Sequence, residues 1–204
     1  MIVIGIVGRI AAGKSTVARL LADRGAEVLD ADQIAHAVLD EPEVRRKIAG
    51  EFGSNLLDAN TRVRRSVLAD LVFGPTESHQ AALDTLEAIV HPQVRQRIEA
   101  RLAAIRDAEE GGDAVVVLDV PLLIQAGWDD LCDRLLLVEC EEQERQRRLA
   151  ARGWSVQQQA ARERAWNRHY SPPAPEKMVC VDASAGEAYT RDQVGRFWNT
   201  LPRT

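Results

Sequence analysis

The sequence of 204 residues contains little cysteine and no long apolar run. Its three cysteines, Cys132, Cys140 and Cys180, form no C-x-x-C pair and stand among apolar residues, which argues against a zinc site or a disulfide framework and indicates buried thiols in a reducing compartment. The apolar run at residues 1–7 is too short for a membrane span and lacks the basic start and the cleavage site of a signal peptide. We therefore expect a cytoplasmic protein.

An excess of positive charge is also absent, because the formal net charge is −5. Without a positive field, nucleic acid and an anionic membrane are not expected partners, and nothing indicates an obligate protein partner. Lysine is scarce as well: of 26 basic residues, only Lys14, Lys47 and Lys177 are lysines. The apolar fraction of 46% and the charged fraction of 28% are typical of a globular chain with a real core.

Short runs rich in β-branched residues alternate with helical patterns along much of the chain. The runs lie at residues 2–7, 27–30, 114–120, 135–138 and 178–181. Helical patterns follow the first run, begin again near Gln33, and occupy residues 141–167 and 186–198. This alternation predicts an α/β fold with a five-stranded, doubly wound parallel sheet.

Residues 40–112 interrupt the alternation, since they show helix-spaced apolar residues and no strand-like run. We expect a helical subdomain here, inserted into a core formed by residues 1–39 and 113–204. Its longest pattern, at about residues 77–108, contains His91 and Pro92, where we expect a kink or a new helix start because proline disfavours helical geometry before it.

Residues 8–15 read G-R-I-A-A-G-K-S and match the phosphate-loop pattern G-x(4)-G-K-[ST] between a buried strand and an amphipathic helix. Glycines let the backbone wrap around phosphate oxygens, while the following helix start supplies positive potential. Lys14 adds a charge for the β- and γ-phosphates, and the Ser15 hydroxyl suits Mg²⁺. We expect a P-loop NTPase fold that binds a nucleoside triphosphate and Mg²⁺, and the motif alone does not separate kinases from ATPases or GTPases. The expected nucleotide-binding residues are Gly8, Ala11, Ala12, Gly13, Lys14, Ser15 and Thr16.

Three aspartates follow predicted strands. Asp30 and Asp32 would lie on one side if the second strand continued through them, and either carboxylate beside a phosphate donor could accept a proton from an attacking hydroxyl. The alternative for Asp32 is a helix N-cap. Asp119 ends the third strand, where it either helps to hold Mg²⁺ or caps the following turn.

Arginines are dense in the polar stretch, at positions 145, 147, 148, 152, 162, 164 and 168. Residues 141–175 could form a helical lid whose guanidinium groups close on the transferring phosphoryl group. A solvated helix face balanced by glutamates accounts for most of these arginines. We expect one or two at most to contact phosphate, with Arg148 and Arg152 as the candidates.

The sequence resembles the dephospho-CoA kinase family in four segments beyond the loop. These are V-L-D-A-D-Q-I-A-H at 28–36, R-R-S-V-L-A-D-L-V-F at 64–73, L-E-A-I-V-H-P at 86–92 and D-V-P-L-L at 119–123. The resemblance implies ATP-dependent phosphorylation of the ribose 3′-hydroxyl of dephospho-CoA. It also implies that Asp32 is the base, and that residues 40–112, with Arg65, His91 and Pro92, bind the acceptor.

Several positions depart from this family's pattern. The family loop usually reads T-G-G-I-G-S-G-K-S, whereas Arg9 replaces a glycine and Ala11 and Ala12 replace Gly-Ser. Arg9 would be strained if its position required positive φ, and otherwise could reach a phosphate or the lid. Gln125 stands in place of a glutamate, and residues 166–175 depart from the family's charged helix. Two alternative functions stay open: another P-loop nucleoside, nucleotide or small-molecule kinase, and a nucleotide sensor without catalysis.

Overall fold

The computed structural model describes residues 1–108, 112–153, 156–167 and 174–202. Its strands are β1 (Ile2–Val7), β2 (Glu27–Asp30), β3 (Val115–Asp119), β4 (Arg134–Glu139) and β5 (Met178–Asp182). Its helices are α1 (Lys14–Ala22), α2 (Ala31–Val38), α3 (Pro42–Phe52), α4 (Arg65–Val72), α5 (Glu77–Ala108), α6 (Glu142–Ala151), α7 (Val156–Asn167) and α8 (Glu187–Asn199).

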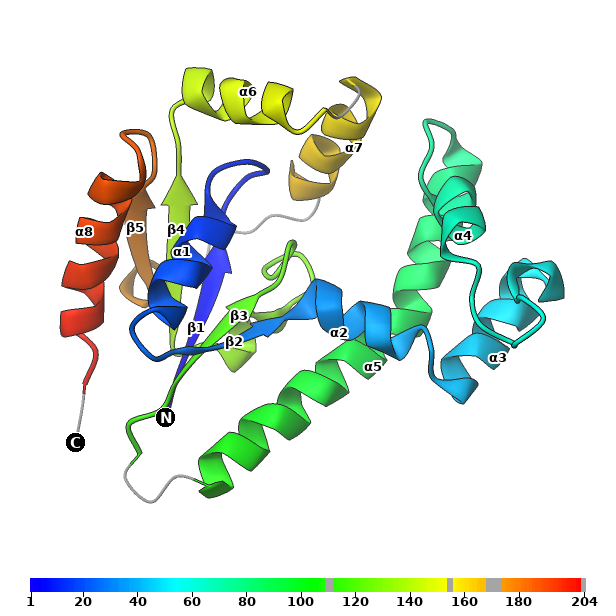
Figure 1. Ribbon diagram of the computed structural model, residues 1–204, viewed down its shortest axis with the longest axis horizontal. Coiled ribbons are helices and arrows are strands. Elements are labelled where there is room, and N and C mark those ends of the chain that lie inside the picture. The colour runs from blue at the N-terminus through cyan, green and yellow to red at the C-terminus, as the bar shows by residue number, and fades with distance from the viewer. Residues whose placement is uncertain (109–111, 154–155, 168–173, 203–204) are drawn as a thin grey trace. The chain divides into compact units, whose positions relative to one another are not determined.

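The strands form one parallel sheet in the order β2-β3-β1-β4-β5 (Figure 1). The predicted five-stranded parallel sheet is confirmed, and the strands at 2–7 and 27–30 have the expected bounds. Because the strands are parallel, their carboxyl ends share one edge of the sheet, where ligands bind in open α/β sheets. The segment that follows β1 emerges at the centre of this edge.

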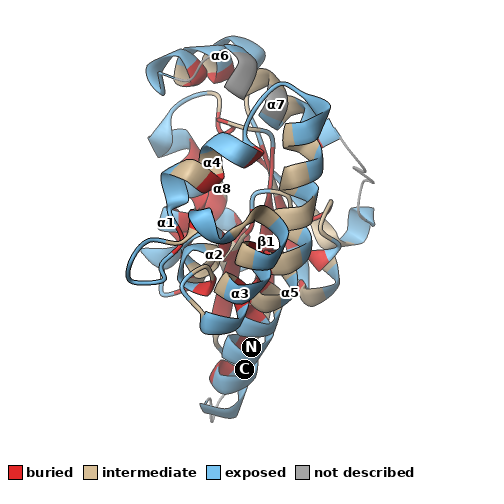
Figure 2. Cartoon of the chain, turned by 90° about the vertical axis from the view of Figure 1, so that its right-hand side faces the viewer, coloured by how far each residue is buried: buried red, intermediate tan, exposed pale blue. Residues whose placement is uncertain are grey.

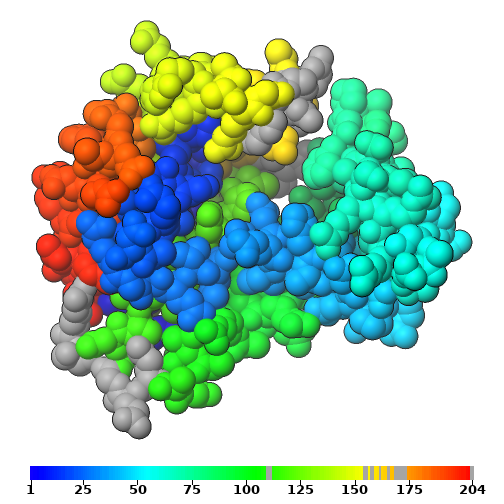
Figure 3. Space-filling model, in the orientation of Figure 1, coloured from blue at the N-terminus to red at the C-terminus, as the bar shows by residue number. Residues whose placement is uncertain are grey.

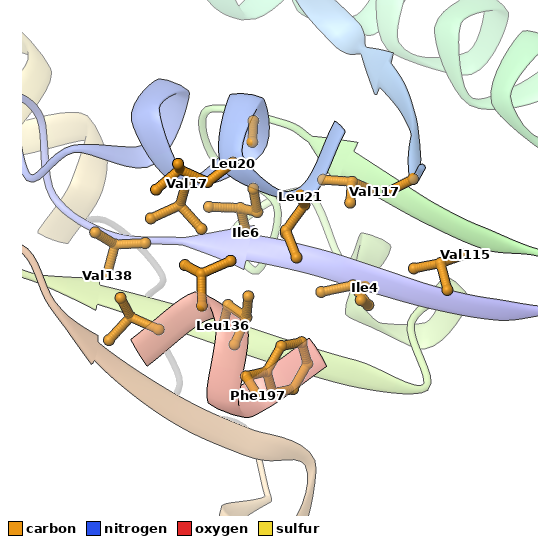
Figure 4. Close-up of a cluster of buried hydrophobic side chains, with 14 of the residues drawn as sticks. Ile4, Ile6, Val17, Leu20, Leu21, Val115, Val117, Leu136, Val138 and Phe197 are labelled. Atoms are coloured by element: carbon orange, nitrogen blue, oxygen red, sulfur yellow. The ribbon is translucent and has the colours of Figure 1, made fainter. Parts of the chain in front are cut away.

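Helices α1 and α8 pack on one face of this sheet. The core that they bury contains Ile4 and Ile6 of β1, Leu20 of α1 and Phe197 of α8 (Figure 4). On the other face, a Cβ atom added to Gly5 would lie 2.8 Å from the Cys132 sulfur, so only glycine permits this close packing under β1. Figure 2 shows β1 as buried and α6 as largely exposed. The sheet therefore provides a rigid base for the loop that follows β1.

The chain divides into two compact units, residues 1–30 with 102–204 and residues 31–101. The sequence predicts both boundaries further along the chain, between residues 39 and 40 and between residues 112 and 113. Within the second unit lie α3, α4 and most of α5, and also α2, which the sequence assigns to the core. Among the helices in the described ranges, none has both the length and the apolar content that crossing a bilayer demands.

Helix α5 runs through Pro92 without a break, so the expected new helix start at this proline is wrong. A proline removes one backbone hydrogen bond from a helix interior. The buried side chains of Val90, Val94 and Ile98 surround it in sequence, and their packing offsets this local loss.

Candidate active site

The phosphate loop, residues 8–13, connects β1 to α1 and lies against β4. A Cβ atom on Gly8 would stand 2.5 Å from the backbone oxygen of Val138, so the loop approaches β4 more closely than any side chain allows. Gly13 precedes α1 with φ of 118°, a left-handed conformation that favours glycine. Both glycines of the motif are therefore required by the backbone path.

Backbone strain in the loop falls on Ala11, not on Arg9. Ala11 has φ of 61°, and it shares a positive φ only with Thr61 among the described non-glycine residues. The family pattern noted above has glycine at this position. Arg9 has no such strain, so its side chain is compatible with the loop, and the positive φ that was considered for it is absent.

The start of α1 is an open site for an anion. The helix has no acidic residue in its first turn and no side-chain cap, so the positive end of its dipole is not neutralised by its own residues. Ser15 is exposed there, and Thr16 is half-buried. The Lys14 ammonium donates to the backbone oxygens of Gly8, at 2.7 Å, and Arg9, at 3.2 Å. Lys14 is thus folded over the loop in which a phosphate would sit.

Two of the three candidate aspartates end neighbouring strands. Asp30 of β2 is the register partner of Asp119 of β3, and Asp119 is also the partner of Ile6, two residues before Gly8. This places the Asp119 backbone one strand away from the loop. Asp119 is half-buried.

Asp32 lies on a helix, and two expectations about it need correction. Strand β2 ends at Asp30, so it does not continue through both aspartates. Helix α2 begins at Ala31 instead of near Gln33, which makes Asp32 an exposed residue of the first turn and not the N-cap. The helix starts earlier because Ala31 and Asp32 can both adopt helical geometry directly after the strand.

Arg148 of α6 holds the loop from the side. Its guanidinium donates to the backbone oxygen of Ala12 at 2.9 Å and to that of Ala183 at 2.6 Å. Glu144 orients it with a third bond of 2.9 Å to Nε. Hydrogen bonds from Arg147 and Arg148 lower the pKa of Glu144 to about 2, so this carboxylate stays charged at neutral pH. Arg152 is exposed and follows the last residue of α6.

One arginine of the polar stretch is buried, although a solvated face was expected for most of them. Arg145 is 3% exposed and binds Glu142 through two nitrogens, at 2.7 and 3.0 Å, and also binds Glu163 of α7. Hydrogen bonds from Arg145 and Gln146 lower the pKa of Glu142. The i, i+3 spacing of Glu142 and Arg145 on a helix indicates an ion pair between them. The burial of Arg145 could not be predicted, because the surrounding stretch contains few apolar residues. Arg168 lies outside the described residues.

The residues assigned to the acceptor all belong to the unit 31–101, together with Asp32. Arg65, at the start of α4, donates to the backbone oxygen of His36 at 3.0 Å and to Asp40 at 2.9 Å. His91 and Pro92 lie on α5, where His91 is half-buried and Pro92 is exposed. The loop, Asp119, Arg148 and Arg152 belong to the other unit.

A loop of this geometry after the central strand of a parallel sheet, beside a helix whose Arg148 contacts the loop, defines a P-loop kinase fold. In Figure 3, atoms of α6 border the N-terminal segment that contains the loop. The family model described as dephospho-CoA kinase matches residues 2–169. The chain belongs to this family.

Named relatives and a solved structure agree with this assignment. The chain is 37% identical over 172 residues to a dephospho-CoA kinase of Rhodopirellula baltica, covering 83% of this chain and 78% of the relative. It is 35% identical to a dephospho-CoA kinase of Carboxydothermus hydrogenoformans, covering 94% and 90%. The crystal structure of TT1252 from Thermus thermophilus superposes with a TM-score of 0.69 at 32% identity and covers 98% of both chains.

Proposed function

We propose that the chain transfers the γ-phosphoryl group of ATP to the ribose 3′-hydroxyl of dephospho-CoA, giving coenzyme A and ADP. The observation that carries this proposal is the family match over residues 2–169, which span the loop, the candidate aspartates and α6. Family membership makes the chain a phosphotransferase. The reaction needs neither nucleic acid nor a membrane, and we assign it to the cytoplasm.

In this proposal the loop binds the phosphates of ATP through backbone N–H groups and the start of α1. Residues 8 and 11–16 form the binding surface, and Lys14 exchanges the oxygens of Gly8 and Arg9 for those of the β- and γ-phosphates. Because Lys14 already lies over the loop on a flexible stem, this exchange requires only side-chain rotation.

Ser15 and Asp119 fit a magnesium site. One hydroxyl and one carboxylate, completed by waters and phosphate oxygens, form the oxygen donor set that Mg²⁺ prefers, and the Asp119 backbone stands one strand from the loop. The chemistry that Mg²⁺ would supply at this site is neutralisation of negative charge on the phosphates. Ser15 and Asp119 would hold it from α1 and β3, respectively.

Asp32 is the proposed general base. Its exposed carboxylate, two residues beyond β2, accepts the proton of the attacking 3′-hydroxyl while the oxygen forms its bond to phosphorus and the bond to ADP breaks. The unit around α3, α4 and α5 supplies the acceptor site, with Arg65, His91 and Pro92. Residues 40–112 thus form the acceptor-binding part.

Arg148 and Arg152 are the proposed lid arginines, in a lid at residues 141–175, of which 154–155 and 168–173 lie outside the described residues. The bonds from Arg148 to Ala12 and Ala183 favour a role in holding the loop and meeting phosphate charge at its side. Arg152 lies exposed at the end of α6, and its forked guanidinium donors match the oxygens of a phosphoryl group.

The test is ADP release, measured by a coupled assay, with dephospho-CoA, nucleosides and shikimate as acceptors. We expect turnover with dephospho-CoA alone. Lys14→Ala should lower kcat by orders of magnitude, and Asp32→Asn by about 10²–10⁴-fold, with an unchanged melting temperature. Asp30→Asn is the matched control, since it removes the neighbouring carboxylate at the end of β2.

Each alternative predicts a different result. Turnover with a nucleoside but not with dephospho-CoA would assign the chain to a different acceptor. ATP binding by calorimetry without turnover on any acceptor would identify a sensor. Wild-type turnover of Asp32→Asn with a lowered melting temperature would show that Asp32 only stabilises α2.

A further inference from the structure

Arg9 connects the phosphate loop to a helix far away in the sequence. Its guanidinium donates to Oε2 of Glu163 on α7 through Nη2, at 2.8 Å, and through Nε, at 3.2 Å. A weaker contact of 3.5 Å reaches Glu142 on α6. The backbone oxygen of Arg9 meanwhile accepts from the Ala12 N–H at 3.1 Å and from Lys14. One residue therefore shapes the loop with its backbone and contacts α7 with its side chain.

Glu163 is shared between two arginines. One carboxylate oxygen accepts from Arg9 and the other from Arg145, which in turn binds Glu142. Two arginines and two glutamates thus form one charge-balanced network that joins the loop, α6 and α7. Because Arg145 is 3% exposed, these carboxylates compensate its buried charge, and the shared Glu163 carboxylate is held in place from both sides.

A second contact fixes α7 one helical turn further on. The backbone oxygen of Trp166 accepts from the Gln125 amide at 2.6 Å, and the Trp166 side chain is 9% exposed. Arg9, Arg145 and Trp166 together line a cavity of about 300 Å³ beside the end of β4. Helix α7 is therefore held by the network at one turn and by Gln125 at the next.

Arg9, Gln125 and Trp166 are also positions at which this sequence departs from the family pattern described above. Three departures that are far apart in the sequence meet at one place, the contact between α7 and the core. A glycine at position 9 would have no side chain to reach Glu163. The attachment of α7 to the loop thus depends on the arginine at position 9.

We propose that Arg9 is a positioning residue that couples the phosphate loop to α7 through Glu163 and so sets where α7 lies during phosphoryl transfer. The guanidinium nitrogens of Arg9 donate to the carboxylates of Glu163 and Glu142. Arg9 therefore affects phosphoryl transfer by positioning α7 and not by contacting a phosphate. This inference rests on the proposed kinase function for its kinetic readout, but the coupling itself exists without substrate.

The first test measures the coupling without substrate, by hydrogen exchange of the backbone amides of α7 in the full chain. Arg9→Ala should raise exchange in residues 156–167 at least fivefold, and Glu163→Gln should do the same, while exchange in α8 stays unchanged. Arg196→Ala is the matched control, because this arginine is 68% exposed and contacts Asp192 on α8. Unchanged exchange of α7 in Arg9→Ala would overturn the proposal, whether or not the chain phosphorylates dephospho-CoA.

The second test is a double-mutant cycle on the kinetic constants. Arg9→Ala and Glu163→Gln should each lower kcat about tenfold, leave KM for ATP within about twofold, and cost no more in combination than singly. A raised KM for ATP in Arg9→Ala alone would show that Arg9 binds phosphate. A hundredfold loss in the double variant would show that the two residues act independently. Either result contradicts the proposal.

Discussion

The positive φ of Ala11 gives a quantitative prediction about stability. Ala11 and Ala12 are neighbours in the loop, with 5% and 2% of their surface exposed, but only Ala11 has φ in the left-handed region. Replacing either by glycine removes one buried methyl group and makes the unfolded chain more flexible. The two substitutions therefore differ mainly in whether they relieve backbone strain.

The magnitudes follow from these terms. Loss of the methyl group costs about 0.8 kcal/mol, and the added freedom of the unfolded chain costs about 0.4–1 kcal/mol. Ala12→Gly should thus lower the free energy of unfolding by about 1.5 kcal/mol. Relief of left-handed strain returns about 1–2 kcal/mol. We expect Ala11→Gly to be close to neutral, and more stable than Ala12→Gly by about 1–2 kcal/mol.

Thermal unfolding by calorimetry, with both variants and the parent chain in one buffer, measures this difference. For a chain of this size it corresponds to a separation of about 2–8 °C between the two melting temperatures. ATP binding to Ala11→Gly should be retained, because glycine preserves the path of the loop. Equal melting temperatures for the two variants, or a lower one for Ala11→Gly, would refute the assignment of strain to Ala11.

Two further predictions concern Gly8 and Cys180. Gly8→Ala should lower the free energy of unfolding by about 2–3 kcal/mol in urea titrations, since its Cβ would meet the Val138 oxygen at 2.5 Å. The control Gly50→Ala, at a helical position open to solvent, should be neutral or stabilising. Cys180 is exposed, so the expectation of a buried thiol is wrong for it, but partial desolvation and the Glu139 carboxylate raise the pKa of its thiol from 9.0 to about 12. Since the thiolate is the reactive form, alkylation of this exposed cysteine should be slow at pH 8 and should still accelerate above about pH 10. Glu139→Gln should speed the alkylation, as peptide mapping would show. An ordinary rate at pH 8 with a plateau by about pH 10 would contradict the raised pKa.

The sequence determined the elements of the sheet and the place of the phosphate loop. Runs such as residues 2–7 contain β-branched and apolar residues in a length typical of buried strands, and the loop motif requires a strand before it and a helix after it. These are local signals, so the bounds of β1 and β2 followed directly. Of the two expectations at Pro92, a kink or a new helix start, the new start is wrong, because side-chain packing along α5 outweighs a local preference.

Only the tertiary structure decided how the loop is held. The positive φ falls on Ala11 and not on Arg9 because the close approach of Gly8 to β4 fixes the path of the chain. Arg148 contacts Ala12 across 136 residues of sequence, and Arg9 contacts Glu163 across 154. Such pairs have no local pattern, since strand order and helix packing bring them together. The sequence by itself therefore determined which chemical groups this protein has, and the fold decided which of them meet.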